Sequence, residues 1–207
     1  MKFFSTDSPL YRFVCKFASL IKLNFLWILF SLPIVTIGAS TAAAFSVALR
    51  LAEDEEGYIT KGFLKGFKEN WKQGTVLALI TFVALYAIYM DFQLFDVLED
   101  NPIVFLICGM LLIAIAYTAI IYAWPLIARY ENTLINSMKN SLDIFRQYFG
   151  RSMLMTVILL LEIFFFLFNT TTYFFAIVIG PGLIIYTISA FSRQVFAAIE
   201  KKNQSGG

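Results

Sequence analysis

The chain has 207 residues, of which 59% are hydrophobic, 17% aromatic and 14% charged, and its mean hydropathy is +0.76. Soluble domains carry about 45–50% apolar and about 25% charged residues, so the core of a globule of this length cannot hide the apolar excess. The composition therefore predicts an integral membrane protein whose main partner is the lipid bilayer. The formal net charge of +2 is too small to indicate a nucleic-acid partner.

The N-terminal region is predicted to form a short amphipathic helix over residues 9–17, followed by a long apolar stretch. Pro33 and Gly38 interrupt this stretch, and two arrangements remain open. The stretch either forms one kinked helix that crosses the membrane once, or forms two short spans, residues 18–33 and 34–50, that fold into a hairpin. The excess of basic residues before the stretch favours the hairpin, with the N-terminus in the cytoplasm.

Residues 60–73 are predicted to form an amphipathic helix in the cytoplasmic interface. Phe63, Phe67 and Trp71 recur every four residues and form an apolar stripe. Four lysines recur at similar spacing on the other face: Lys61, Lys65, Lys68 and Lys72. These lysines either anchor the ends of the neighbouring spans or present a docking face to a cytoplasmic partner or to anionic lipid headgroups.

Two further membrane segments are predicted over residues 74–95 and 102–128, because a span needs roughly 20 apolar residues. The turn between them, residues 96–101, is short and acidic, so the two segments are predicted to form a helical hairpin. A third amphipathic helix is predicted over residues 133–150, where apolar side chains again follow helical spacing.

Residues 152–192 carry a single charge, that of Glu162. A helix of about 40 residues would be about 60 Å long, which is too long for one crossing, so the chain must turn back. The turn is predicted at Asn169, because its side chain and those of the threonines that follow compete with helical backbone bonds. This gives spans at 152–168 and 174–197, the second bent or interrupted at Gly180, Pro181 and Gly182.

The basic residues cluster in alternate loops. They are dense in residues 50–72 and 129–151 and absent from residues 91–101 and 152–192, which is typical of a chain whose basic loops and C-terminus lie in the cytoplasm. The predicted fold is an all-α, polytopic transmembrane bundle forming a single domain over residues 1–207. It has five or six membrane segments arranged as three hairpins, each preceded by an amphipathic helix.

Two stretches carry a family resemblance: NFLWILFSLPIVTIGASTAA at residues 24–43 and EGYITKGFLKGFKENWKQ at residues 56–73. They resemble the YesL-like family of small bacterial membrane proteins, a domain of unknown function. The resemblance implies a bacterial plasma-membrane protein. Because members are often encoded beside carbohydrate ABC transporters, it also implies an accessory role in sugar uptake, with transporter subunits as partners. No catalytic or binding residues can be carried over.

Glu162 is the one acidic residue near the middle of a predicted span, about 15 Å from its cytoplasmic start. A carboxylate at that depth costs at least ~2.5 kcal/mol unless it is neutral or paired. Asn169, on the same helical face, and Asn24 are candidate partners. Glu162 either hydrogen-bonds across helices or lies in a proton, ion or solute path.

Five residues are candidate helix breaks: Pro33, Gly38, Gly180, Pro181 and Gly182. The break at Pro33 and Gly38 is either a tight turn packed against its neighbours or a broken helix whose freed backbone groups line a ligand site.

The residue inventory argues against catalysis. The chain has no histidine for a serine or cysteine mechanism, and Glu162 has no second acidic residue at similar depth. Cys15 and Cys108 form neither a zinc pattern nor a disulfide framework. The sequence predicts a non-enzymatic protein without cofactor or metal, acting as an accessory or interaction component. The alternative is a small transporter or channel with Glu162 in its path.

Overall fold

The computed structural model describes residues 9–55, 58–97 and 103–205, and every regular element within these ranges is helical. The elements are α1 (Pro9–Ser31), η1 (Ile34–Thr36), α2 (Ile37–Ala52), α3 (Ile59–Glu69), α4 (Trp71–Val97), α5 (Ile103–Ile120), α6 (Ala123–Arg129), α7 (Leu134–Gln147), α8 (Phe149–Leu167) and α9 (Thr170–Ser205). Among the described residues, six helical segments are long and apolar enough to cross a membrane. The all-α membrane class is therefore confirmed, with six candidate spans.

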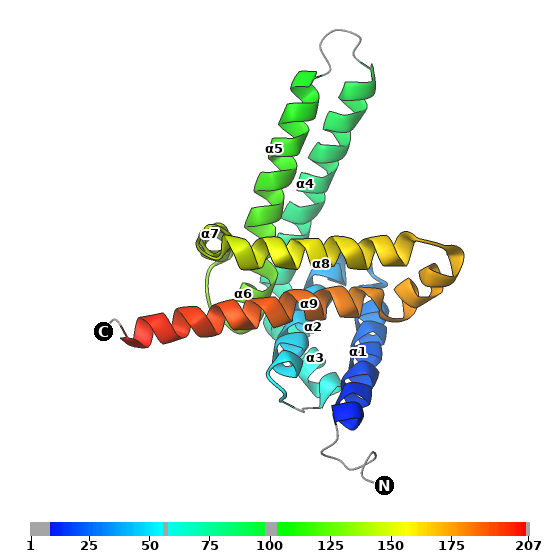
Figure 1. The fold of residues 1–207 in the computed structure, drawn as a ribbon, viewed down its shortest axis with the longest axis vertical. Helices are drawn as coiled ribbons and strands as arrows, with labels where there is room; N and C mark the ends of the chain where they lie inside the picture. The colour runs from blue at the N-terminus through cyan, green and yellow to red at the C-terminus, as the bar shows by residue number, and fades with distance from the viewer. Residues whose placement is uncertain (1–8, 56–57, 98–102, 206–207) are drawn as a thin grey trace.

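The six candidate spans form three pairs. One of the six, the span that contains α2, lies at the centre. Helix α2 packs against α1, α3, α4, α6 and α9. Helices α4 and α5 lie side by side and project away from the other elements, whereas α8 and α9 run together across the direction of that pair (Figure 1). The three pairs therefore point in different directions from a shared centre.

Small side chains allow α2 to occupy this centre. Five of its alanines are completely buried: Ala39, Ala42, Ala43, Ala44 and Ala48. At the crossing with α4, a Cβ atom on Gly38 would overlap the carbonyl oxygen of Gly74. Gly38 is therefore a point of backbone contact between two helices and does not break α2, because close helix packing in lipid requires small residues.

The apolar stretch predicted over residues 18–50 is divided between two α-helices, α1 and α2. Helix α1 ends at Ser31, and Pro33 lies between α1 and η1. The hydroxyl group of Thr36 donates to the carbonyl oxygen of Phe30 at 2.5 Å and to that of Pro33 at 2.7 Å. These bonds satisfy acceptors that the end of a helix leaves free.

Several predicted boundaries are wrong. The separate helix expected over residues 9–17 does not exist, because nothing breaks the chain before Ser31 and α1 is continuous. The helix expected over residues 60–73 ends at Glu69, where Asn70 Nδ2 donates to the carbonyl oxygen of Gly66 at 3.1 Å. Lys72 therefore belongs to α4. Most of the acidic turn expected at 96–101 lies outside the described residues.

The segment expected over residues 102–128 is interrupted after Ile120. The hydroxyl of Ser141, on α7, accepts the N–H of Tyr122 at 3.1 Å and donates to the carbonyl oxygen of Thr118 at 2.8 Å. A side chain inserted into the backbone ladder in this way interrupts a helix. Helix α6 then begins at Ala123, and α5 and α6 together form one of the six candidate spans.

Candidate functional site

The buried amide of Asn24 lies where α1 crosses α9. Its side-chain nitrogen donates to the carbonyl oxygens of Ile177 and Val178 at 2.8 and 2.9 Å. Its side-chain oxygen accepts the backbone N–H of Gly182 at 3.0 Å. Pro181 has no N–H for the carbonyl of Ile177 and its ring disturbs the neighbouring bond, so these are the groups that proline leaves unpaired. One side chain therefore completes the backbone bonding of α9.

This contact explains why the predicted interruption at Gly180, Pro181 and Gly182 does not occur and α9 is continuous from Thr170 to Ser205. A Cβ atom on Gly182 would lie 3.1 Å from the Cβ atom of Asn24, so glycine lets α1 approach closely enough for the bonds to form. From the sequence, Asn24 is a candidate partner of Glu162, and the Gly-Pro-Gly segment is a candidate helix break. The structure brings the two together.

Glu162, on α8, accepts a hydrogen bond from the hydroxyl of Thr187, on α9, at 2.6 Å. Its second oxygen, Oε2, is buried and has no hydrogen-bond partner among the described residues. Thr187 was not predicted as the partner. If α8 and α9 were paired symmetrically about a turn at Asn169, Glu162 would lie opposite roughly residue 176. The partner is Thr187 instead, because the register is set by how α8 packs against α9.

The two partners expected for Glu162 form their bonds elsewhere. Asn24 lies at the α1–α9 crossing described above. Asn169 occupies the turn before α9, where its side-chain oxygen accepts the N–H of Thr172 at 3.0 Å and its own N–H donates to the Thr172 hydroxyl at 3.1 Å. This reciprocal pair is a helix cap, and it places the turn where the sequence predicted it.

An apolar cleft of about 820 Å³ lies between α1, α8 and α9, and Glu162 forms part of its wall. Most of the lining is aromatic or aliphatic, including Phe13, Phe17, Phe165, Phe166, Phe175 and Leu183. Lys16 also lines the cleft, and its ammonium group is 2.5 Å from a carboxylate oxygen of Asp54. The hydrogen bond from Lys16 holds the pKa of the exposed Asp54 carboxyl below its usual range.

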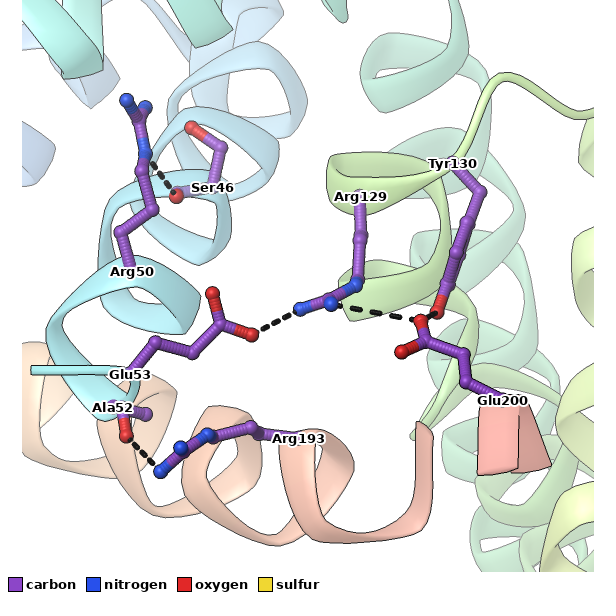
Figure 2. A network of polar contacts seen from close by, with 8 residues as sticks. All are labelled: Ser46, Arg50, Ala52, Glu53, Arg129, Tyr130, Arg193 and Glu200. Atoms are coloured by element: carbon purple, nitrogen blue, oxygen red, sulfur yellow. Dashed lines mark hydrogen bonds and ion pairs between the residues drawn. The ribbon is translucent and has the colours of Figure 1, made fainter. Parts of the chain in front are cut away.

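A network of charged side chains joins the ends of α2, α6 and α9 (Figure 2). Arg129, at the end of α6, lies 2.5 Å from Glu53 and 3.5 Å from Glu200. The hydroxyl of Tyr130 donates to the same Glu200 oxygen at 2.6 Å. Arg193 donates to the carbonyl oxygen of Ala52, the last residue of α2, at 2.6 Å. The network thereby links α2, α6 and α9, which belong to three different pairs of candidate spans.

Partial burial, followed by the hydrogen bond to the Glu200 carboxylate, raises the pKa of Tyr130 to about 12. Both causes disfavour the phenolate, which would lose hydration and face a like charge.

An open groove of about 1210 Å³ lies beside α3, between the start of α4 and the loop that follows α6. This groove, called the basic groove below, is lined by Lys65, Lys68, Lys72 and Arg129, together with the carboxylates of Glu69 and Glu131. Four cations therefore face two anions. Gln73 donates to the carbonyl oxygen of Asn132 at 2.7 Å, which holds the loop in place.

Three of the four predicted lysines share the basic groove. Lys65 also lies 3.8 Å from Glu69, one helical turn away. Lys61 is not in the groove lining, and its ammonium group stands 4.8 Å from the centre of the Tyr58 ring. The groove wall from Tyr130 to Thr133 has no periodic pattern in the sequence, so only the folded structure places it beside the lysines.

No group of three or more histidine, cysteine, aspartate or glutamate residues that could hold a metal ion occurs in the described part of the chain.

The six apolar segments define a multi-pass α-helical membrane protein. The family model named "Protein of unknown function, DUF624" matches residues 20–92. The chain is also 28% identical over 131 residues to the uncharacterized protein YesL of Bacillus subtilis (strain 168), an alignment covering 61% of this chain and 62% of YesL, less than two thirds of that relative. The chain is therefore similar to the YesL-like, DUF624 family, which agrees with the resemblance noted in the sequence. No solved structure matches it.

The family match covers only part of the features described above. Residues 20–92 contain Asn24, the Gly38–Gly74 contact and the lysine helix α3. Glu162 and the Gly-Pro-Gly segment lie beyond the matched residues.

Proposed function

We propose that this protein is a non-enzymatic accessory component of the bacterial plasma membrane that docks a cytoplasmic partner associated with carbohydrate ABC transport. The observation that carries the proposal is the basic groove, an open surface of about 1210 Å³ with four cations and two carboxylates in its lining. A groove with excess positive charge suits an acidic segment of a partner, because complementary charge steers encounter and selects partners.

The charge pattern supports a cytoplasmic position for this groove. Basic loops remain on the cytoplasmic side of a bacterial membrane, and the groove combines the basic blocks at residues 50–72 and 129–151. The proposed topology has the N-terminus, these loops and the C-terminus in the cytoplasm.

Two of the lysines are available for a partner. Lys68 and Lys72 form no ion pair within the part of the chain that the structure describes, whereas Arg129 is held by Glu53 and Glu200. The implied partner is a subunit of a carbohydrate ABC transporter, which the family resemblance suggests. Anionic lipid headgroups are the competing occupant.

Affinity purification from bacterial membranes in mild detergent tests this proposal. Wild-type protein is expected to recover ABC transporter subunits in a salt-sensitive manner, and the triple variant Lys65→Glu, Lys68→Glu, Lys72→Glu is expected to lose at least ~90% of them. The matched control Lys139→Glu, Arg146→Glu changes basic residues on α7 outside the groove. Recovery of no transporter subunit, or equal recovery by the triple variant, would contradict the proposal, and recovery of anionic lipid alone would identify the competing occupant.

A second function, that of a small transporter with Glu162 in the solute or proton path, is supported by a separate observation. Glu162 lines the apolar cleft and one of its buried oxygens lacks a partner among the described residues. Intramembrane carboxylates with this character occur in ion and proton paths. Glu162→Gln is expected to abolish proton-coupled flux in reconstituted vesicles, and unchanged flux would exclude Glu162 from such a path.

A further inference from the structure

We infer that the cleft between α1, α8 and α9 binds a lipophilic organic cation, with the carboxylate of Glu162 as its counter-ion. The inference rests on the second proposed function only for the location of the site. It concerns equilibrium binding, which a protein that transports nothing can also show.

The charge balance of the cleft is the first argument. Two charged side chains, Lys16 and Glu162, lie in its wall. The charge of Lys16 is balanced by Asp54, whose carboxylate oxygen is 2.5 Å away. Glu162 receives only a neutral hydroxyl group, that of Thr187, and its other oxygen has no partner in the described ranges. When Glu162 is ionised, its negative charge therefore has no counter-ion among the described residues of the lining.

The chemistry of the lining is the second argument. Aromatic side chains from α1, α8 and α9 line the same cleft as the carboxylate, among them Phe17, Phe165 and Phe175. The faces of aromatic rings attract cations, most strongly when the cation has lost its water. A small hydrated ion would find almost no polar groups here to replace its water, so the charge must be spread over an organic cation.

The same features exclude other classes of ligand. A sugar would need many hydrogen-bonding groups, and the lining offers few besides Glu162, Lys16 and Tyr186. An acidic lipid would place a second negative charge beside Glu162. The volume of about 820 Å³ lies in the range of ligand pockets, about 300–1,000 Å³, and admits a compact cation with several rings.

Calorimetric titration of the full chain in neutral detergent with tetraphenylphosphonium and tetraphenylborate tests the inference, because the two ions have the same shape and opposite charge. The wild-type protein is expected to bind the cation at least tenfold more tightly than the anion. Glu162→Gln is expected to weaken cation binding at least tenfold. Asp143→Asn, which changes an exposed carboxylate of α7 outside the cleft lining, is expected to leave it unchanged.

A second variant gives a result that does not depend on whether Glu162→Gln folds. Leu183→Trp fills the cleft while leaving Glu162 in place, and it is expected to reduce tetraphenylphosphonium binding at least tenfold. Equal affinity for the two ions, wild-type affinity in Glu162→Gln, or wild-type affinity in Leu183→Trp would each overturn the inference. Binding without uptake into vesicles would support this inference while contradicting the proposed transport function.

Discussion

Helices α2 and α5 are both apolar and of similar length, 16 and 18 residues, yet their surroundings differ sharply. In the candidate span that contains α2, 61% of the most apolar window is buried inside the protein, against 11% for the span that contains α5. Helix α2 is built largely from alanine and other small residues, whereas α5 is rich in isoleucine and leucine. Hydrophobicity places both helices in the membrane, but side-chain size decides which one the other helices can approach.

The difference in side-chain size also accounts for the exposed surface of the α4–α5 pair. Both helices present large apolar side chains outward, among them Leu79, Val83, Ile107, Leu111 and Ile115. Because this pair projects away from the central helix (Figure 1), lipid must cover these side chains. Substitutions should therefore have large effects around α2 and small effects on the outer face of α5.

The largest effect is expected for Gly38→Leu, at the crossing of α2 and α4. Any Cβ atom there overlaps the backbone of Gly74, so the two helices must separate, at a cost of about 3 kcal/mol or more. Size-exclusion chromatography after graded heating should show loss of the monodisperse peak at a markedly lower temperature. Gly150→Leu is the matched control, since nothing lies within 4 Å of the added Cβ atom. Equal melting of both variants would refute the proposed importance of close packing at α2.

A somewhat smaller effect is expected for Asn24→Leu, where α1 crosses α9. The substitution removes hydrogen bonds to two carbonyl groups and one N–H group of α9, which corresponds to about 2–3 kcal/mol. Pro181→Ala restores a backbone N–H, so the double variant should recover much of the lost stability in a thermal-shift assay. If Pro181→Ala rescues nothing, Asn24 does not act by repairing the proline site.

The network at the ends of α2, α6 and α9 predicts a weak dependence on alkaline pH. The pKa of Tyr130 is raised to about 12, above its unfolded value of about 10. The contribution of this group is complete below pH 10 and is lost as the pH rises from about 10 to about 12. Because Tyr130 is partly exposed, the loss is at most about 1 kcal/mol after allowance for solvent screening. Tyr130→Phe should remove this component from unfolding curves measured across that range, and an unchanged alkaline slope would contradict the assignment.

The smallest effect is expected for Leu111→Ala on the outer face of α5. Its side chain is 57% exposed, so lipid can fill the space it leaves, and the free energy of unfolding should change by less than about 0.5 kcal/mol. A thermal-shift assay in lipid nanodiscs provides the measurement. A shift as large as that of Asn24→Leu would mean that a second protein surface, and not lipid, covers this face.

Local features of the sequence were sufficient for much of the fold. Apolar length predicted five or six membrane segments, side-chain capping at Asn169 predicted the turn before α9, and the motif around Pro33 predicted the similarity to the DUF624 family. Local rules failed where a distant side chain intervened. Pro181 interrupts an isolated helix, but Asn24 repairs it, and Ser141 divides a stretch that composition alone predicts to be continuous.

The sequence by itself therefore determined that this is a membrane protein, because the transfer of a segment into lipid depends on how many consecutive apolar residues it contains. The tertiary structure decided which polar groups meet. The bond between Asn24 and Gly182 joins residues 158 positions apart, and that between Glu162 and Thr187 depends on the register of two packed helices. Such pairings arise from packing geometry, which no local spacing of residues specifies.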